Sequence, residues 1–521
     1  MSLPIKGKHP SEQGSRRPPD PARKAAVYTL ERVLEQGAYA NLVLAGALDD
    51  DAENSASDSL TASDKQAASQ SSAPSGRAPG LNAQQRSFTT AMVYGTLTRL
   101  YTIDHVLTER LKQSLASLEP TVRTILRLGV FQLLYSRSVP PSAAVDESVR
   151  LCQKLSRPQA CGLVNAVLRS ITREPPLINP KNAPLYYSLP PELYGYVKLA
   201  AGAAAAPLLA EKLLAAPPVT LRTNCLKAKP QEIIELLAAV GIEASPGSYL
   251  PEAVVPELGG QPVHKLVIYQ DGLASVQDEG AMLTSHAVDP QPGESILDLC
   301  AAPGGKSAHM AELTCDKAAI TACDIHPGRV DLIRSQAERL GITSISAYTA
   351  DATGRDWPQE LAREYDRVLA DVPCSGLGLL ARKPEIRRNM THERIQSLLP
   401  LQAAILDHAA TLVRPGGVLV YSTCTFNPAE NDGQVDSFLA RQAGAFSRED
   451  LTRFLPAALL ADEATAEQAR GGSITLLPHR HGTDGFYIAR LRKDAAQTEA
   501  QTGASANNST LAKQVLKDDK K

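Results

Sequence analysis

Aromatic residues are scarce in this chain of 521 residues, where Phe, Trp and Tyr together make up 4%. Hydrophobic residues still reach 43%, so we expect aliphatic cores and the composition of a soluble globular protein. The length exceeds one typical domain and indicates two to four domains of roughly 100–200 residues each. The formal net charge of -2 excludes a protein held on nucleic acid by bulk positive charge alone.

Cysteine clusters and long apolar runs are also missing. The eight cysteines are spread out, without a CxxC pair or a Cys/His ligand spacing, which argues against a structural zinc site and against a disulfide scaffold. No uncharged apolar run of about 18 residues occurs, and no apolar segment follows the basic N-terminal residues. The sequence therefore predicts neither a membrane span nor a signal peptide, and favours a reducing, cytoplasmic location.

Two tails and one internal segment have compositions that cannot form a core. Residues 1–20 and 494–521 are polar, and residues 49–80 contain one Leu and no aromatic residue. Such segments bury too little apolar surface to offset the entropy lost on ordering. We expect all three to be disordered, the last as an insertion inside the first domain.

The remaining chain predicts three domains. Residues 21–175 carry apolar residues at helical spacing, beginning with a helix over 21–48, and indicate an all-α domain. Residues 176–275 indicate a linker and a small α+β domain. Its expected elements are strands at 219–224 and 264–269 and a helix at 230–241.

From residue 276 to 493 the pattern alternates between strand and helix. The expected strands are at 294–300, 318–324, 344–351, 365–371 and 417–423. Helices fall between them, and Pro400 indicates a helix start or kink before Leu401. This alternation predicts a doubly wound parallel sheet, a Rossmann-like α/β fold that binds ligands at the carboxyl ends of its strands.

The first candidate site is LDLCAAPGGKS at 297–307, where a strand passes through a glycine-containing turn into a helix. Small residues let a ligand approach the backbone, and a helix N-terminus offers N–H groups to a carboxylate or phosphate. An ordinary strand–helix turn is the alternative. The segment does not read GxGxxG, so a pyrophosphate site is not indicated.

Acidic residues close the next two expected strands. Asp324 lies 20 residues after Gly304, the spacing expected for a contact to ribose, and Asp351 closes the following strand. A carboxylate there accepts hydrogen bonds from ribose hydroxyls. Capping of the next helix explains each residue equally well.

Two cysteines follow strands that are expected to share one edge of the sheet. Cys374 lies in DVPCSGLG, and Cys424 lies 50 residues later in YSTCT. A lone cysteine of this kind is typical of a small buried hydrophobic residue. Two of them beside a ligand site indicate thiol reactivity, and no further ligands cluster with them to form a metal site.

Several ordered motifs together resemble one enzyme family. LDLCAAPGGKS, DVPCSGLG, RKPEIR, YSTCT with PAEN, and DGFY resemble the NOL1/NOP2/Sun RNA cytosine-C5 methyltransferases. FQLLYSRSVPPSAAVDESVRLCQK and GLVNAVLR resemble the NusB-like RNA-binding domain of the bacterial Sun/RsmB (Fmu) branch. The resemblance covers most of residues 21–493. The sequence departs at 277–282, QDEGAM, where the family has small hydroxylated residues after Gln-Asp.

The resemblance implies S-adenosylmethionine as the cofactor and no metal. The residues implied to bind S-adenosylmethionine are Cys300, Ala301, Ala302, Pro303, Gly304, Gly305, Lys306, Asp324, Asp351 and Asp371. Of these, Asp324 would contact the ribose, Asp351 would lie by the adenine and Asp371 would also lie near the target cytosine. Cys424 would be the nucleophile, and Cys374 would help to release the product. The implied substrate is a cytosine of 16S ribosomal RNA, bound by a monomer before full subunit assembly.

The chemistry gives these residues a purpose. C5 of cytosine is a poor nucleophile, and attack of a thiolate on C6 gives C5 enamine character. A thiol with a pKa of about 8.5 is only a few per cent ionised at neutral pH, so its surroundings must lower that pKa. Asp371 is the candidate acid near N3, and the base must be unstacked to reach the thiol.

The residues alone do not decide which cysteine attacks. Pro373-Cys374 is similar to the Pro-Cys pair of DNA cytosine methyltransferases, whereas the RNA family uses the cysteine of its Thr-Cys motif. We favour Cys424 on that resemblance.

Basic residues near the Cys374 loop, and one in LRTN, are expected to contact RNA. They are Arg382, Lys383, Arg387 and Arg222. A solvated helix start is the alternative for the first three. Two other functions stay open, namely the same chemistry on transfer RNA and a non-catalytic RNA-binding factor for ribosome assembly. A small-molecule methyltransferase would not explain the paired cysteines.

Overall fold

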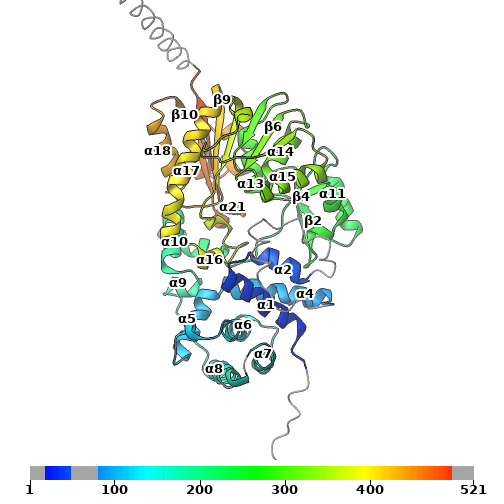
Figure 1. The fold of residues 1–521 in the computed structure, drawn as a ribbon, viewed down its shortest axis with the longest axis vertical. Coiled ribbons are helices and arrows are strands. Elements are labelled where there is room, and N and C mark those ends of the chain that lie inside the picture. Colours follow the sequence, from blue (N-terminus) through cyan, green and yellow to red (C-terminus); the bar gives the residue numbers. More distant parts are fainter. Residues whose placement is uncertain (1–17, 49–79, 157, 496–521) are drawn as a thin grey trace, which may run out of the picture. The chain divides into compact units, whose positions relative to one another are not determined.

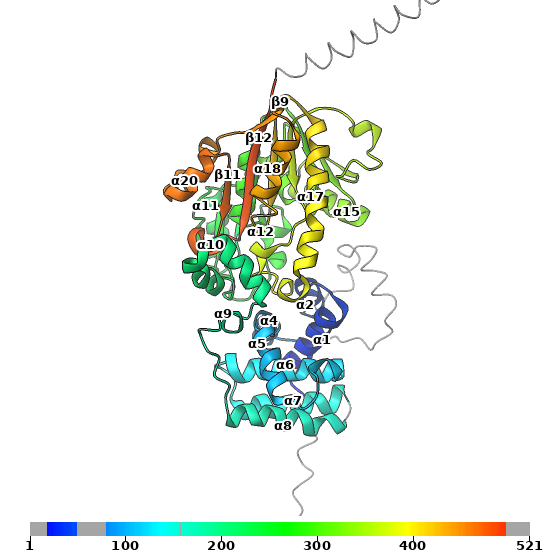
Figure 2. The same cartoon turned by 90° about the vertical axis from the view of Figure 1, so that its left-hand side faces the viewer.

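In the computed structural model the chain folds into two compact units, one ending at Pro191 and the other beginning at Glu192 (Figure 1, Figure 2). The described residues are 18–48, 80–156 and 158–495. The segments expected to be disordered lie outside the described residues except at their edges. Each unit is described by itself below.

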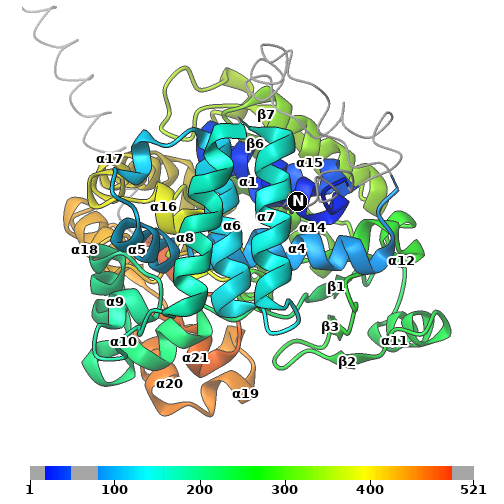
Figure 3. The ribbon, with the colours of Figure 1, turned by 90° about the horizontal axis from the view of Figure 1, so that it is seen from below.

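The first unit is helical throughout its described residues. Its elements are α1 (Pro21–Gln36), α2 (Ala40–Leu48), α4 (Ala83–Thr98), α5 (Leu100–Arg110), η2 (Leu115–Ser117), α6 (Pro120–Tyr135), α7 (Pro141–Leu155), η3 (Pro158–Ala160), α8 (Cys161–Arg173) and α9 (Ala183–Tyr186). Helices α6, α7 and α8 pack side by side (Figure 3) over buried aliphatic residues such as Leu126, Val130 and Leu168. The all-α prediction is confirmed. The single helix expected over 21–48 is two helices, because Gly37 adopts a left-handed conformation (φ 71°) that ends α1.

The second unit contains a small antiparallel sheet. Its strands, in spatial order, are β2 (Ala244–Pro246), β3 (Ala253–Pro256), β1 (Leu221–Thr223) and β4 (Ala274–Val276). Helix α11 (Pro230–Ala239) packs on it through Ile233 and Leu237. The strand expected at 264–269 is wrong, since η4 (Val263–Lys265) and α12 (Val267–Gln270) stand there. The backbone N–H groups of this run bond to nearby carbonyls in turns, such as Leu266 to Val263, and not to a neighbouring strand.

The large sheet carries the expected parallel strands. Its spatial order is β10 (Phe446–Arg448), β12 (Phe486–Lys493), β9 (Val413–Thr423), β8 (Tyr365–Asp371), β5 (Ser295–Asp298), β6 (Ala319–Asp324) and β7 (Ile345–Thr349), with β11 (Ser473–Leu476) paired to β12. The five strands β5 to β9 pair in parallel, which confirms the Rossmann-like fold, and β12 is antiparallel to β9. Strands β10 to β12 were not predicted. Charged residues interrupt β12, yet Arg490 is fully buried there and pairs with Glu449 at 2.8 Å.

Alternate residues of these strands enter two different cores. Ile296, Leu369 and Val420 face the core shared with α13 (Glu279–Val288), α14 (Gly305–Leu313) and α15 (Pro327–Leu340). Leu297 and Leu419 face the core shared with α17 (His392–Leu412) and α18 (Asp432–Arg441). A side-chain period of two therefore lets helices cover both faces of the sheet.

The remaining elements of the second unit are short, apart from one helix. They are α10 (Pro191–Lys212), η5 (Gln359–Leu361), η6 (Leu377–Leu379), α16 (Ile386–Asn389), η7 (Thr452–Phe454), α19 (Ala457–Leu460), α20 (Glu463–Arg470) and α21 (Pro478–His481). Of the two alternatives for Pro400, the helix start is wrong, because this proline lies inside α17 and the Thr391 side chain caps that helix; the kink stays a prediction.

Helix α10 is the one described helix long and apolar enough to cross a membrane by length and composition. Lys198 lies within it, so the helix contains no uncharged apolar run of about 18 residues. Its backbone leaves the helical region at Gly202 (φ 74°, ψ 160°), and Pro207 follows. The element is therefore two shorter helical segments joined at a kink.

A buried ion pair joins the small sheet to helix α14, which packs on the large sheet. Arg222 of β1 is 0% exposed, and its guanidinium donates to both carboxylate oxygens of Glu312 in α14, at 2.8 and 2.7 Å. It also donates to the carbonyl of Gly305 at 2.7 Å and to the side-chain oxygen of Gln277. The expected RNA contact of Arg222 is therefore corrected, because the protein interior satisfies its guanidinium.

Arg222→Met is expected to destabilise the second unit by about 3–5 kcal/mol, because the Glu312 carboxylate is left buried without its partner. Urea unfolding followed by the fluorescence of the single tryptophan, Trp357, reports on this unit. The matched control is Arg470→Met, whose side chain is 55% exposed beside Glu463 and should change stability by less than about 0.5 kcal/mol. Equal losses for the two variants would contradict the role given to Arg222.

Candidate active site

The loop between β5 and α14 combines a tight turn with an open helix start. Gly304 has φ 99°, and a Cβ there would lie 3.2 Å from the Cα of Ile333, so both backbone and space require glycine. A Cβ added to Gly305, the first residue of α14, would meet nothing within 4 Å. The first N–H groups of this helix have no intrahelical partner, and together with this open space they suit the carboxylate of a ligand.

The residues Cys300 to Lys306, expected to bind the cofactor, form this loop and the first turn of α14. The N–H of Ala301 donates to the carbonyl of Cys323 at 2.8 Å and ties the loop to β6. The peptide between Ala302 and Pro303 is cis. Burial raises the pKa of the Cys300 thiol well above its ordinary value, so this side chain lines the loop as a neutral thiol.

Asp324 and Asp351 lie at neighbouring strand ends, as the sequence predicts. Asp324 is 4% exposed, accepts the N–H of His326 at 3.1 Å and pairs with Arg329 at 3.2 Å. One oxygen of Asp351 accepts the N–H and the hydroxyl of Thr353, at 2.9 and 2.8 Å. These contacts hold both carboxylates in fixed orientations. A ligand hydroxyl that bonds to Asp324 would share this carboxylate with Arg329.

A lysine–aspartate pair connects the loop to strands β8 and β9. Lys306 Nζ donates to Asp371 Oδ2 at 2.6 Å, and the Ser422 hydroxyl donates to Asp371 Oδ1 at 2.8 Å. Nζ also lies 5.0 Å from the centre of the Phe486 ring, within cation–π range. Burial opposes the charge on Lys306, but Asp371 raises the pKa of its ammonium above the ordinary value. The pair therefore places a protonated amine next to a carboxylate.

Asp298 is a buried acid that the sequence analysis passed over. It ends β5, is 1% exposed and accepts the Ser307 hydroxyl at 2.6 Å. Burial and, less strongly, the Asp371 carboxylate together raise its pKa to about 7, although the Ser307 hydrogen bond and the Lys306 charge oppose the shift. Its signal in the sequence is an acid inside the apolar run ESILDLC at 294–300.

The two candidate cysteines meet in the structure. Cys374 Sγ and Cys424 Sγ lie 3.3 Å apart, within hydrogen-bond range for sulfur. The parallel register sets Asp371 opposite Ser422, so the segments that leave β8 and β9 emerge side by side at the carboxyl edge. A separation of 50 residues in sequence thus becomes a direct contact.

The contact makes the two thiols chemically different. A Cys424 thiolate can accept a hydrogen bond from the Cys374 S–H across this contact. That hydrogen bond is the largest effect that lowers the pKa of Cys424, and Lys383 and Lys306 add to it, against burial and Asp371. The same hydrogen bond, together with burial, raises the pKa of Cys374 well above its ordinary value. Cys424 is therefore the sulfur better disposed to exist as a thiolate.

A buried carboxylate from the PAEN segment holds both cysteine loops. Glu430 is 0% exposed. Its donors are the N–H and hydroxyl of Ser375 and the side-chain amides of Gln402 and Asn427, with the N–H and amides at 2.8, 3.0 and 2.9 Å. The Ser375 hydroxyl also lies 2.9 Å from that of Thr425. Because these two residues directly follow Cys374 and Cys424, Glu430 sets the distance between the two sulfurs.

The basic residues after the Cys374 loop differ in what they can reach. Arg387 is 3% exposed and donates to two backbone carbonyls, so its expected RNA contact is corrected. Arg382 is partly buried and donates to Asp484 at 2.6 Å and to Asp278 at 3.2 Å. Lys383 is exposed. Its positive charge acts on Cys424 and lowers the pKa of that thiol.

The segment QDEGAM at 277–282, which differs from the family pattern, has a structural role. Asp278 caps α13 by accepting the N–H of Gly280 at 2.9 Å. Glu279 is 5% exposed, and its carboxylate accepts three successive backbone N–H groups of residues 248–250, at 3.0, 2.7 and 2.9 Å. Glu279 thus attaches the loop before β3 to α13.

Alkylation of Cys424 should show a pKa below the ordinary thiol value of about 8.5, and that pKa should rise in Cys374→Ala, because the hydrogen-bond donor is lost. Reactivity falls as the pH drops through this pKa. The measurement is the rate of iodoacetamide labelling at Cys424 against pH, followed by peptide mass spectrometry. Cys315→Ala removes an exposed cysteine and should leave the profile unchanged. The same pKa with and without Cys374 would refute the assignment.

Glu430→Gln is expected to cost about 1–3 kcal/mol, because the amide turns a donor toward groups that need an acceptor and leaves one of them buried without a partner. It should also slow Cys424 alkylation by changing the approach of the two loops. Denaturant unfolding and the labelling rate measure both effects. Glu463→Gln, at a side chain 83% exposed, is the matched control and should be silent in both assays.

Comparison with known proteins follows the same division of the chain. The family model of the 16S rRNA methyltransferase RsmB/F matches residues 285–492, the NusB family matches residues 52–173, and the RsmF/B-like ferredoxin-like domain matches residues 200–261. The three models thus account for the large sheet, the helical unit and the region of the small sheet. Their order along the chain agrees with the architecture described above.

Individual relatives extend over most of the chain. The probable ribosomal RNA small subunit methyltransferase B of Bacillus subtilis is 37% identical over 421 residues, covering 79% of this chain and 92% of that protein. The ribosomal RNA small subunit methyltransferase B of Pseudomonas syringae pv. tomato is 32% identical, covering 81% and 92%. The crystal structure of PH0851 has a TM-score of 0.73 at 25% identity, over 91% of this chain and 99% of that one. The chain therefore belongs to the 16S rRNA methyltransferase RsmB/F family.

Proposed function

We propose that this enzyme transfers a methyl group from S-adenosylmethionine to C5 of a cytosine in 16S ribosomal RNA, through a covalent bond between Cys424 and C6. Its family supports methyl transfer to ribosomal RNA. The observation that carries the C5 chemistry is the 3.3 Å contact of Cys374 and Cys424, beside the Lys306–Asp371 pair. Methylation of an amine or a hydroxyl would not need a thiol pair, whereas an unreactive ring carbon does need a nucleophile to activate it.

The residues of the loop after β5 fit S-adenosylmethionine. The open start of α14 at Gly305 would accept the methionine carboxylate. Asp324 would accept the ribose hydroxyls, and Asp351, at the next strand end, would lie by the adenine. When bound, the cofactor supplies an electrophilic methyl group.

The Cys424 thiolate begins the reaction by forming a bond to C6 of the cytosine. The electrons of the C5=C6 bond move toward N3, which takes up a proton from the Lys306–Asp371 pair, since that pair carries one ammonium. C5 then has enamine character and takes the methyl group, and N3 returns its proton. Burial around the thiol excludes water that would compete for these protons.

The product leaves when a base removes the proton at C5 and the C6–S bond breaks, which restores the Cys424 thiolate. Cys374 stands 3.3 Å from the departing sulfur and donates its S–H to it, which stabilises the leaving thiolate. Without Cys374 the elimination should slow more than the addition. This assigns the two cysteines separate roles in release and attack.

RNA would approach the edge of the sheet where Lys383 is exposed, with Arg382 contributing if the RNA competes with Asp484 for its guanidinium. The target base would be unstacked to reach Cys424, as in a loop or single strand. The helical unit matches the NusB family and would add RNA-binding surface. We place the enzyme in the cytoplasm as a monomer acting on small-subunit RNA before full assembly.

The test is methyl transfer from labelled S-adenosylmethionine to unmodified 16S ribosomal RNA, with the nucleotide mapped by mass spectrometry. Wild type should form 5-methylcytosine, and Cys424→Ala should form none. Cys374→Ala should accumulate a covalent protein–RNA adduct that denaturing gels detect. Cys315→Ala, at an exposed cysteine, is the matched control and should behave as wild type.

Other outcomes would change the proposal in defined ways. Full activity in Cys424→Ala would exclude it as the nucleophile, and an adduct that forms only through Cys374 would exchange the two roles. Methylation of transfer RNA in place of ribosomal RNA would keep the chemistry and change the substrate. A folded protein that binds the cofactor and methylates neither RNA would favour the non-catalytic assembly factor.

A further inference from the structure

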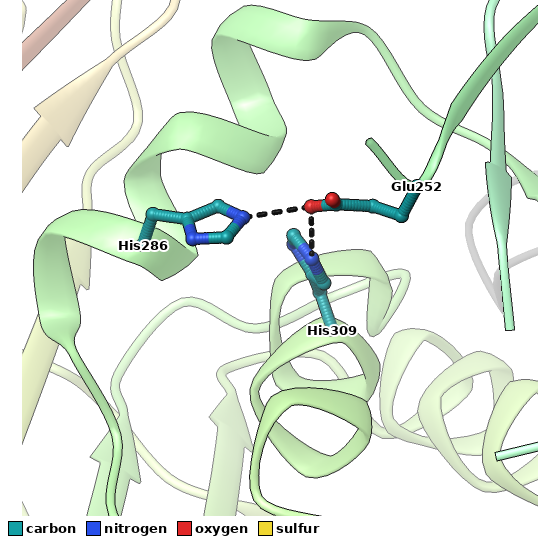
Figure 4. Close-up of side chains that lie close together, drawn as sticks. All are labelled: Glu252, His286 and His309. Carbon is teal, nitrogen blue, oxygen red and sulfur yellow. Dashed lines mark hydrogen bonds and ion pairs between the residues drawn. The ribbon is translucent and has the colours of Figure 1, made fainter. Parts of the chain in front are cut away.

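Three side chains with metal-binding atoms converge away from the cysteine pair. Glu252 lies just before β3, His286 lies in α13 and His309 lies in α14 (Figure 4). Glu252 Oε1 is 2.7 Å from His286 Nε2 and 3.2 Å from His309 Nε2, and the three atoms all lie within 4.8 Å of one another. The two imidazole edges and the carboxylate oxygen thus point into one small volume.

We propose that Glu252, His286 and His309 form a binding site for a first-row divalent transition metal ion, with Zn²⁺ the best match. Imidazole nitrogens and a carboxylate oxygen are ligands of such ions, whereas Mg²⁺ and Ca²⁺ prefer oxygen ligands alone. Neighbouring ligands of a tetrahedral zinc, with bonds of about 2.0–2.2 Å, lie about 3.3 Å apart. The observed 2.7 and 3.2 Å separations need only tenths of an ångström of movement to reach that value.

Hydrogen bonding within the cluster is the competing explanation, and under either explanation one ring nitrogen of His309 has no partner. Glu252 accepts from both rings, but His309 is 1% exposed and its Nδ1 is buried with no hydrogen-bond partner among the described residues. A metal-bound His309 would lack the outer partner that normally orients such a ligand. The site should therefore exchange its ion and not hold it as a permanent structural zinc does.

Access and connectivity give this site a physical consequence. The His286 side chain is 26% exposed, so a fourth position is open to water and an ion can enter from solvent. The three ligands come from the loop before β3 and from α13 and α14, two of the helices that pack on the large sheet. Since α14 also carries Lys306, a bound ion would fasten the small sheet to the helix that begins at the cofactor loop, without touching the thiol pair.

Sequence spacing alone indicated no metal site. The three ligands are separated by 34 and 23 residues, and no ligand pair has the short spacing of a zinc finger or of a helical His pair. The convergence arises because α13 packs against α14 and because Glu252, just before β3, reaches a histidine of each helix. The eight cysteines of the chain are rival ligands that the test must distinguish.

Co²⁺ titration of the reduced, metal-free full-length chain tests the proposal. Wild type should bind about one Co²⁺ per chain, with visible d–d bands and without the charge-transfer band of a cobalt–thiolate bond. Zn²⁺ should displace the Co²⁺, and Mg²⁺ should not. His286→Gln should weaken binding by at least about 10–100-fold, the loss that removal of a mere supporting group produces. His105→Gln, in a helix of the other unit and 39% exposed, should bind as wild type.

A second readout does not depend on any variant being folded. Zn²⁺ should protect His286 in wild type from diethylpyrocarbonate, mapped by peptide mass spectrometry, and His105 should be modified equally with and without Zn²⁺. A thiolate band, unchanged binding by His286→Gln, or modification of His286 that Zn²⁺ does not slow would each overturn the proposal.

Discussion

The parallel pairing of β8 with β9 is the constraint on which the candidate active site depends. Because Asp371 stands opposite Ser422 in that register, the segments carrying Cys374 and Cys424 leave the sheet at one edge. A shift of one residue would turn every side chain of a strand to the opposite face, and the two cores packed against the sheet oppose such a shift. Packing of Val420 and Leu419 of β9 into separate cores thus helps to hold the register that brings the two sulfurs together.

Electrostatics then shifts the pKa values of the two cysteine thiols in opposite directions. A thiolate in a buried site is unfavourable, and the structure offsets this for Cys424 with a hydrogen bond from Cys374 and with the positive charges of Lys383 and Lys306. Glu430 stands on the side of Cys374 and adds to the shift that keeps it protonated. Both residues are cysteines that follow parallel strands. The residues around each sulfur therefore decide which of the two thiols ionises more easily.

Buried arginines link separate segments of this protein through hydrogen bonds. Arg222 fastens the small sheet to α14, Arg490 lies within β12, and Arg387 satisfies two carbonyls near the cysteine loops. Each such group is costly to bury, and hydrogen bonds to carboxylates or backbone carbonyls offset that cost. The guanidinium group suits a carboxylate, a carbonyl and a phosphate equally well, so the RNA contacts expected for Arg222 and Arg387 could not be separated from these internal uses by residue type.

The sequence by itself determined the order of strands and helices, the glycine turn before α14, and the candidate acids and thiols, because these depend on periodicity and on local backbone requirements. It missed β10 and β11, which have only three and four residues, and β12, where charges interrupt the apolar pattern. It also placed a strand at 264–269, where local turns form. Tertiary structure alone decided that Cys374 touches Cys424, that Glu430 holds them, that Asp298 is a buried acid, and that Glu252, His286 and His309 converge. These are contacts between residues distant in the chain, and their geometry follows from strand register and helix packing, which no local pattern encodes.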